Sequence, residues 1–134
     1  MFDIAKIHDV TSAPVEIKNP STGESIGVTI TVAGPEHPQR KAIEFAKQRK
    51  LRAQLQKTGK IELGDPADDE LDTIETLAIC TLAWSGVTEG GVDVPCTKEA
   101  ALKLYSTDGL AWLRAQVLAA MGERERFIQT SAIA

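Results

Sequence analysis

The fold is decided by residues 71–104, which have the sequence LDTIETLAICTLAWSGVTEGGVDVPCTKEAALKL. After Leu71, three apolar residues recur at the spacing of a helix with one buried face: Ile74, Ala78 and Leu82. From Leu77 onward apolar side chains spread almost all the way round, which is typical of a helix at the centre of a core. The sequence therefore predicts a core helix that continues to Gly86, followed by a glycine-rich loop and a short helix.

Capping residues mark where the neighbouring helices begin. Asp65 and Pro66 supply an N-cap and a first-turn proline, and the acidic residues after them suit the positive end of the helix dipole. Thr97 caps a short helix over residues 98–105. A final helix starts near Leu110, and its apolar face should cover the core helix. That face is formed by Leu113, Val117, Met121 and Ile128.

The N-terminal part predicts a β-hairpin over residues 13–33, because two alternating runs flank a cluster of turn residues at 19–24. A basic helix follows over residues 38–57, and its scattered apolar residues predict that it is only partly buried. We assign no element to residues 1–12, and we expect residues 129–134 to fray.

These elements predict a mainly α fold with a small β-hairpin, of the α+β class, in a single domain of residues 1–134. Its compact helical core should occupy residues 65–131. A chain of 134 residues with 43% hydrophobic and 25% charged residues can bury such a core without disulfides or a metal. Because no run of 18 apolar residues and no signal-peptide pattern is present, we expect no membrane partner and a cytosolic site of synthesis.

Charge is segregated along the chain. Residues 40–60 contain eight basic residues against Glu44 alone, and residues 61–76 contain seven acidic residues and no basic one. Blocks of opposite sign attract within a chain or between copies of it, so a homo-oligomer is one expectation. The basic helix also suggests nucleic-acid binding, although the isoelectric point of about 5.2 and the adjoining acidic block argue against it. The candidate partner-binding residues are Arg40, Lys47, Arg49, Lys50, Arg52 and Trp112.

Trp112 is included because it lies opposite the apolar face of its helix, and tryptophan is enriched where proteins bind one another. Trp84 is instead predicted to belong to the core. His8 and His37 lie in polar, loop-like stretches without a recognisable catalytic partner.

The remaining residue types indicate no chemistry. The two cysteines are predicted to be buried free thiols, since a redox pair would require distant side chains to converge. The glycine-rich loop lacks the spacing of a phosphate-binding motif. We therefore predict a protein that is not an enzyme and uses no cofactor and no metal.

Three motifs occur in a characteristic order. Residues 19–24, NPSTGE, lead into an alternating strand and a basic helix. Residues 82–86, LAWSG, precede the glycine-rich loop and the segment PCTKEAA at 95–101. Residues 122–127, GERERF, close the chain with a polar segment that ends in phenylalanine. This order resembles the tail assembly chaperones of long-tailed bacteriophages, whose patterns are D-P-x-T-G-E, W-x-G … P-F-[ST]-x-E-x-A and a polar ending with phenylalanine.

The chain departs from that family at Asn19, where Asp is commoner, and at Cys96, where an aromatic residue is commoner. The resemblance implies a non-enzymatic viral protein that binds the tape-measure protein and helps bring the tail-tube protein to it. It also implies a place in the host cell cytoplasm and absence from the mature virion. The alternatives are a structural tail or connector protein of the virion and a nucleic-acid-binding adaptor that uses the basic helix.

Overall fold

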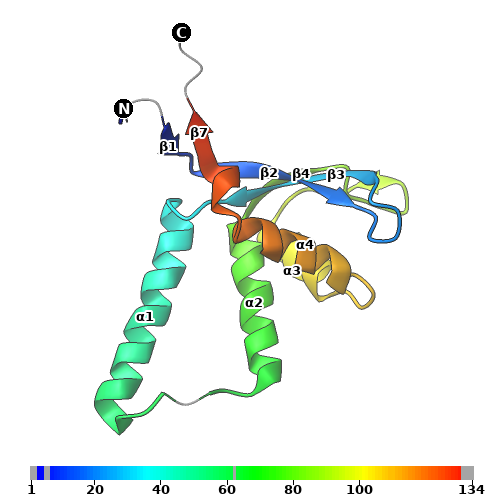
Figure 1. Ribbon diagram of the computed structural model, residues 1–134. Coiled ribbons are helices and arrows are strands. Elements are labelled where there is room, and N and C mark those ends of the chain that lie inside the picture. Colours follow the sequence, from blue (N-terminus) through cyan, green and yellow to red (C-terminus); the bar gives the residue numbers. More distant parts are fainter. Residues whose placement is uncertain (1–2, 5–6, 62, 131–134) are drawn as a thin grey trace.

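The computed structural model describes residues 3–4, 7–61 and 63–130, and within them it confirms the predicted α+β class (Figure 1). The helices are α1 (Pro38–Thr58), α2 (Pro66–Cys80), α3 (Lys98–Ser106) and α4 (Ala111–Met121), followed by the 3-10 turn η1 (Arg124–Phe127). The strands are β1 (Ile7–Asp9), β2 (Ser12–Lys18), β3 (Ser25–Ala33), β4 (Thr81–Ser85), β5 (Thr88–Glu89), β6 (Val92–Asp93) and β7 (Ile128–Thr130).

The predicted hairpin is present as β2 and β3, which pair in antiparallel register with Val15 opposite Ile30. Buried and exposed residues alternate along β2, so one face of the hairpin packs on the core and the other faces water. Asn19 stabilises the turn between the strands, because its side-chain oxygen accepts a hydrogen bond from the backbone N–H of Ser21 at 2.8 Å. Pro14 is tolerated because β2 is an edge strand.

The prediction that the core helix continues to Gly86 is wrong, because α2 ends at Cys80 and residues 81–85 form the strand β4. This strand pairs with the free edge of β3, with Ile30 opposite Trp84, and so completes a three-stranded sheet of order β2-β3-β4. A short apolar run that contains threonine and tryptophan suits either a helix or a strand. The unpaired hydrogen-bonding groups of β3 favour the strand here.

The hydroxyl group of Thr81 marks the point where helix becomes strand. It donates a hydrogen bond to the carbonyl oxygen of Leu77 at 2.7 Å. Because that bond takes its single proton, the hydroxyl of Tyr105 on α3 donates to Thr81, at 2.6 Å. Tyr105 is fully buried, so α2, β4 and α3 are joined inside the core.

Helices α2, α3 and α4 cover one face of the sheet and bury a single hydrophobic cluster with it (Figure 1). The helical members of this cluster are Ile74, Leu77, Ala78, Cys80, Ala101, Tyr105, Leu113, Val117, Ala120 and Met121. Phe127 of η1 is fully buried beside Gly34, where a side chain at residue 34 would collide with its ring. Trp84, predicted in the core, is only partly buried, and its indole N–H donates to the carbonyl of Val94 at 2.8 Å.

The two ends of the described chain pair with each other. The final helix ends at Met121, so Ile128 does not share its face as predicted but begins β7, which pairs with β1. Residues 129 and 130 therefore belong to a strand rather than to a frayed tail, and residues 131–134 lie outside the described residues.

The buried tyrosine predicts how stability depends on alkaline pH. Burial raises the pKa of Tyr105 to about 12, above its ordinary value near 10. In that interval the unfolded chain releases the proton and the folded chain keeps it, so stability is complete below about pH 10 and falls as the pH rises towards 12. We expect the loss of unfolding free energy from this group to reach at most roughly 3 kcal/mol. Urea unfolding of the wild-type protein and of Tyr105→Phe between about pH 9 and 12 checks this, because only the wild-type protein has the titrating hydroxyl group. If the unfolding free energies of the two proteins fall in parallel with pH, the prediction is contradicted.

Substitutions at two glycines distinguish the cost of a steric clash from the cost of backbone strain. Gly86 has a φ of 80°, and an added Cβ would overlap the carbonyl oxygen of Gly27. Gly90 has a φ of 59°, and nothing lies near the place where its Cβ would be. We expect Gly90→Ala to cost about 1 kcal/mol of unfolding free energy and Gly86→Ala about 3 kcal/mol. Chemical denaturation measures both, and equal losses would show that the contact with Gly27 is unimportant.

Candidate functional site

The most exposed part of the molecule is a pair of antiparallel helices that project from the body (Figure 1). Helix α1 contains no buried residue, and from Glu44 to Thr58 every side chain except that of Gln54 is exposed. The first half of α2, residues 66–72, is exposed as well. We call residues 44–61 and 63–72 the arm.

Local signals explain why α1 is helical without a core beneath it. His37 is its N-cap, and its Nδ1 atom accepts a hydrogen bond from the backbone N–H of Gln39 at 3.2 Å. Pro38 occupies the first turn, and Gly59 ends the helix in the left-handed conformation with its N–H bonded to Leu55. Most residues between are strong helix formers. The structure therefore gives His37 a capping contact, and His8 lies in β1.

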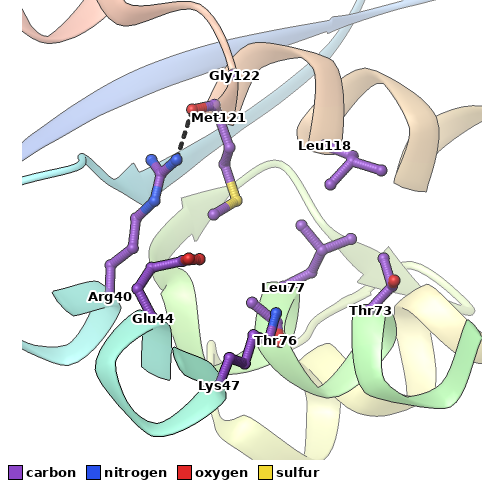
Figure 2. Close-up of a pocket in the computed structure, with 9 residues that line it drawn as sticks. All are labelled: Arg40, Glu44, Lys47, Thr73, Thr76, Leu77, Leu118, Met121 and Gly122. Atoms are coloured by element: carbon purple, nitrogen blue, oxygen red, sulfur yellow. Dashed lines mark hydrogen bonds between the residues drawn. The ribbon is translucent and has the colours of Figure 1, made fainter. Parts of the chain in front are cut away.

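Arg40 fixes the base of the arm to the body. Its guanidinium donates one hydrogen bond to the carbonyl of Ala33, at 3.1 Å, and one to the carbonyl of Met121, at 3.0 Å. These two acceptors end β3 and α4, so one planar side chain holds three elements together. Figure 2 shows the bond to Met121. Arg40 was predicted to bind a partner, but the structure engages it inside the chain.

A cleft of about 210 Å³ lies beside Arg40, between α1, α2 and α4 (Figure 2). Its apolar surface comes from the side chains of Leu77, Met121 and Leu118. Leu118 is 50% exposed, so it presents apolar surface at the edge of the cleft. Polar side chains line the remaining wall: Arg40, Glu44, Lys47, Thr73 and Thr76. The cleft thus combines an apolar floor with a polar rim.

The apolar surface continues along the arm. Leu51 and Leu55 are each 40% exposed and follow Glu44, a cleft residue, by seven and eleven positions. At 3.6 residues per turn these positions lie on the cleft side of α1. Six of the eleven large apolar residues that are exposed in the described chain belong to the arm: Phe45, Leu51, Leu55, Ile61, Leu63 and Leu71.

A second cleft, of about 290 Å³, lies on the other side of the arm. Lys47 and Thr76 line both clefts, so the clefts adjoin where α1 meets α2. On each helix the other lining residues of the two clefts fall on different sides of these shared positions at 3.6 residues per turn, so the clefts lie on the two sides of the arm. The second cleft is more strongly charged, and its lining consists of Ile43, Ala46, Lys47, Lys50, Asp72, Glu75, Thr76 and Ile79.

The structure distributes the predicted binding residues unevenly. Lys47 and Lys50 line the clefts of the arm, and Arg49 and Arg52 are exposed on α1 away from the cleft of Figure 2. Within the described residues none of these four forms an ion pair. Trp112 packs partly against the core and lines neither cleft, so the structure does not bring it together with the basic residues.

Leu118 and Thr73 complete the cleft, although neither was predicted to do so. The sequence contained only a weak indication that Leu118 would be exposed, namely that it lies off the apolar face predicted for its helix. An apolar residue off that face indicates exposure but does not identify the surface that it joins.

The described residues contain no group of three or more His, Cys, Asp or Glu side chains placed to hold a metal ion. Burial raises the pKa of the Cys80 thiol and of the Cys96 thiol, which favours the protonated form of both. No helix in the described part of the chain has both the length and the apolar character required to cross a bilayer. What the arm offers is exposed apolar side chains beside a cleft.

Comparisons of the chain with protein-family models, with curated proteins and with solved structures gave no match.

The contacts of Arg40 predict that it acts in stability. Arg40→Ala leaves two carbonyl groups without their charged donor, and we expect it to lower the free energy of unfolding by about 2 kcal/mol. Arg52→Ala removes the same side chain from an exposed position on the same helix and should change stability by less than about 0.5 kcal/mol. Guanidinium denaturation of both variants provides the measurement. Equal losses would contradict the assigned role of Arg40.

Proposed function

We propose that this chain is a tail assembly chaperone of a long-tailed bacteriophage, that it binds an amphipathic segment of the tape-measure protein, and that it catalyses no reaction. The observation that carries the proposal is the arm, whose apolar residues are exposed beside a cleft with an apolar floor. The order of the three sequence motifs supplies the identity of the client.

The cleft suits the way in which an amphipathic helix binds in a groove. An apolar side chain of the client would contact Leu77, Met121 and Leu118, and the next anchors would contact Leu51 and Leu55 further along α1. Helix α1 has 21 residues, which corresponds to about 30 Å at 1.5 Å per residue. A client helix of similar length therefore finds contacts along the whole arm.

The balance of apolar and charged surface suits temporary binding. Lys47 and Glu44 stand at the rim of the cleft, so water can solvate the site when the client leaves. Several copies bound along one long client would hold it by multivalency, although each contact alone is weak. In the proposed role the chain acts in the host cytoplasm, brings the tail-tube protein to the tape-measure protein, and departs before the virion is complete.

A nucleic-acid-binding adaptor is the second candidate, because α1 displays cations that form no ion pair in the described structure. The acidic residues of α2 flank these cations across the second cleft and would repel phosphates. This candidate predicts an affinity for DNA that collapses as salt is added.

The client proposal predicts a soluble complex. Co-expression with the tape-measure protein of the same genome should keep that protein soluble and yield a complex that purifies intact. We expect Leu51→Gln combined with Leu118→Gln to weaken the complex at least about tenfold, because both changes remove apolar anchors. Phe45→Gln is the matched control, since Phe45 is exposed on the side of α1 away from the cleft. Co-purification and titration calorimetry measure both effects.

A tape-measure protein that stays equally soluble without this chain would contradict the proposed function. An equal loss with Phe45→Gln would contradict the assignment of the cleft. Mass spectrometry of purified particles tests the remaining alternative, because a structural tail or connector protein would be present there at full copy number.

A further inference from the structure

The cleft of Figure 2, where the client is proposed to bind, is called the client cleft. The other side of the arm carries two parallel stripes of opposite charge. On α1 the stripe follows helical spacing through Ala46, Lys50, Ala53 and Lys57. On α2 it follows the same spacing through Asp68, Asp72, Glu75 and Ile79. Five of these residues line the second cleft together, which shows that the stripes share one side: Ala46, Lys50, Asp72, Glu75 and Ile79. We call this side the charged face.

The charges of this face are not satisfied within the chain. In the described structure Lys50, Lys57, Asp68 and Asp72 form no ion pair, although basic and acidic stripes lie side by side. Glu75 has one distant partner, Lys98, at 4.0 Å. The two helices therefore define a common surface on which these four charges are left for water or for a partner.

Charge complementarity restricts what can cover this face. A partner must be acidic where it meets α1 and basic where it meets α2, with the two strips about one helix apart. A second copy of this chain meets that requirement when a two-fold axis runs along the arm, because the axis places α1 of each copy on α2 of the other. An acidic or a basic partner alone would leave one stripe opposed by like charge.

The vertical register also fits. A two-fold axis along the arm keeps every residue at its own height, and Lys50 lines the same cleft as Asp72 in its own chain. Lys50 of one copy therefore meets Asp72 of the other. Lys57 lies about 10 Å nearer the tip than Lys50, and Asp68 lies about 6 Å nearer the tip than Asp72, so the long side chain of Lys57 can reach Asp68 of the other copy. Ala46 and Ala53 are small, which lets the facing helices approach closely.

We propose that two copies of this chain associate through their charged faces and form a four-helix bundle from their arms. The client cleft lies on the opposite side of each arm, so the dimer presents two outward clefts. This inference does not depend on the proposed function, since it concerns the free protein without any client.

Sedimentation velocity of the full chain over a range of micromolar concentrations tests the proposal. We expect a monomer–dimer equilibrium at low salt that shifts towards monomer near 1 M salt, where the Debye length is about 3 Å. Lys50→Glu with Lys57→Glu should raise the dissociation constant at least about tenfold, because each change acts twice across the two-fold axis. Arg52→Glu alters charge on another side of α1 and should leave the dissociation constant nearly unchanged.

A charge swap gives the decisive measurement. The Lys50→Glu, Lys57→Glu variant and an Asp68→Lys, Asp72→Lys variant should each be monomeric alone, since residues 50, 57, 68 and 72 then all carry one sign in each variant. Mixed in equal amounts, they should form a heterodimer, because acidic stripes then face basic ones throughout. Circular dichroism of each variant checks that the helices remain.

A wild-type chain that is monomeric at every concentration in low salt overturns the proposal. A dimer that both charge-reversed variants retain, or a mixture that stays monomeric although each variant is folded, overturns it as well. Failure of these tests leaves client binding unaffected, because that is measured with the tape-measure protein on the other side of the arm.

Discussion

The structure depends on the pairing of β4 with β3 immediately after α2 ends. Because Thr81 changes the chain from helix to strand within one residue, the C-terminal end of α2 is fixed against the sheet. The hydroxyl pair of Thr81 and Tyr105 then fixes α3 to the same point. Because that end is fixed, the first half of α2 projects away from the body, and α1 runs beside it.

This constraint separates two kinds of helix in one small chain. Helices α3 and α4 and the end of α2 are stabilised by burial in the hydrophobic cluster. Helix α1 is stabilised by its caps, by its composition and by the clamp that Arg40 forms with Ala33 and Met121. A helix that buries no residue contributes little to the core, so its surface is available for recognition. The arm is therefore where the sequence can vary its charges and apolar residues at small cost to the fold.

The sequence was sufficient where short-range signals decide structure. Three local signals lie within a few residues of the elements that they control: the turn at residues 19–24, the first-turn Pro38 and the N-cap Thr97. Those elements occur where they were predicted. The end of α2 was mispredicted because β4 pairs with a strand about fifty residues earlier, and periodicity within residues 77–85 cannot register such a partner. The cleft was missed for a similar reason: Lys47, Thr73 and Leu118 come from three helices whose relative angles no local pattern specifies.

The segregated charges show how a local signal can be correct and still incomplete. The sequence indicated that the basic and acidic blocks would attract, and the structure does place α1 beside α2. Exposed ion pairs contribute little, because water and salt screen them and long side chains lose freedom when they pair. The attraction therefore does not suffice to join their side chains in ion pairs, and in the described structure Lys50 and Asp72 remain unpaired across the second cleft. Charges left in this state cost the monomer little, since water solvates them, yet they favour a partner that carries the same two stripes in the opposite order.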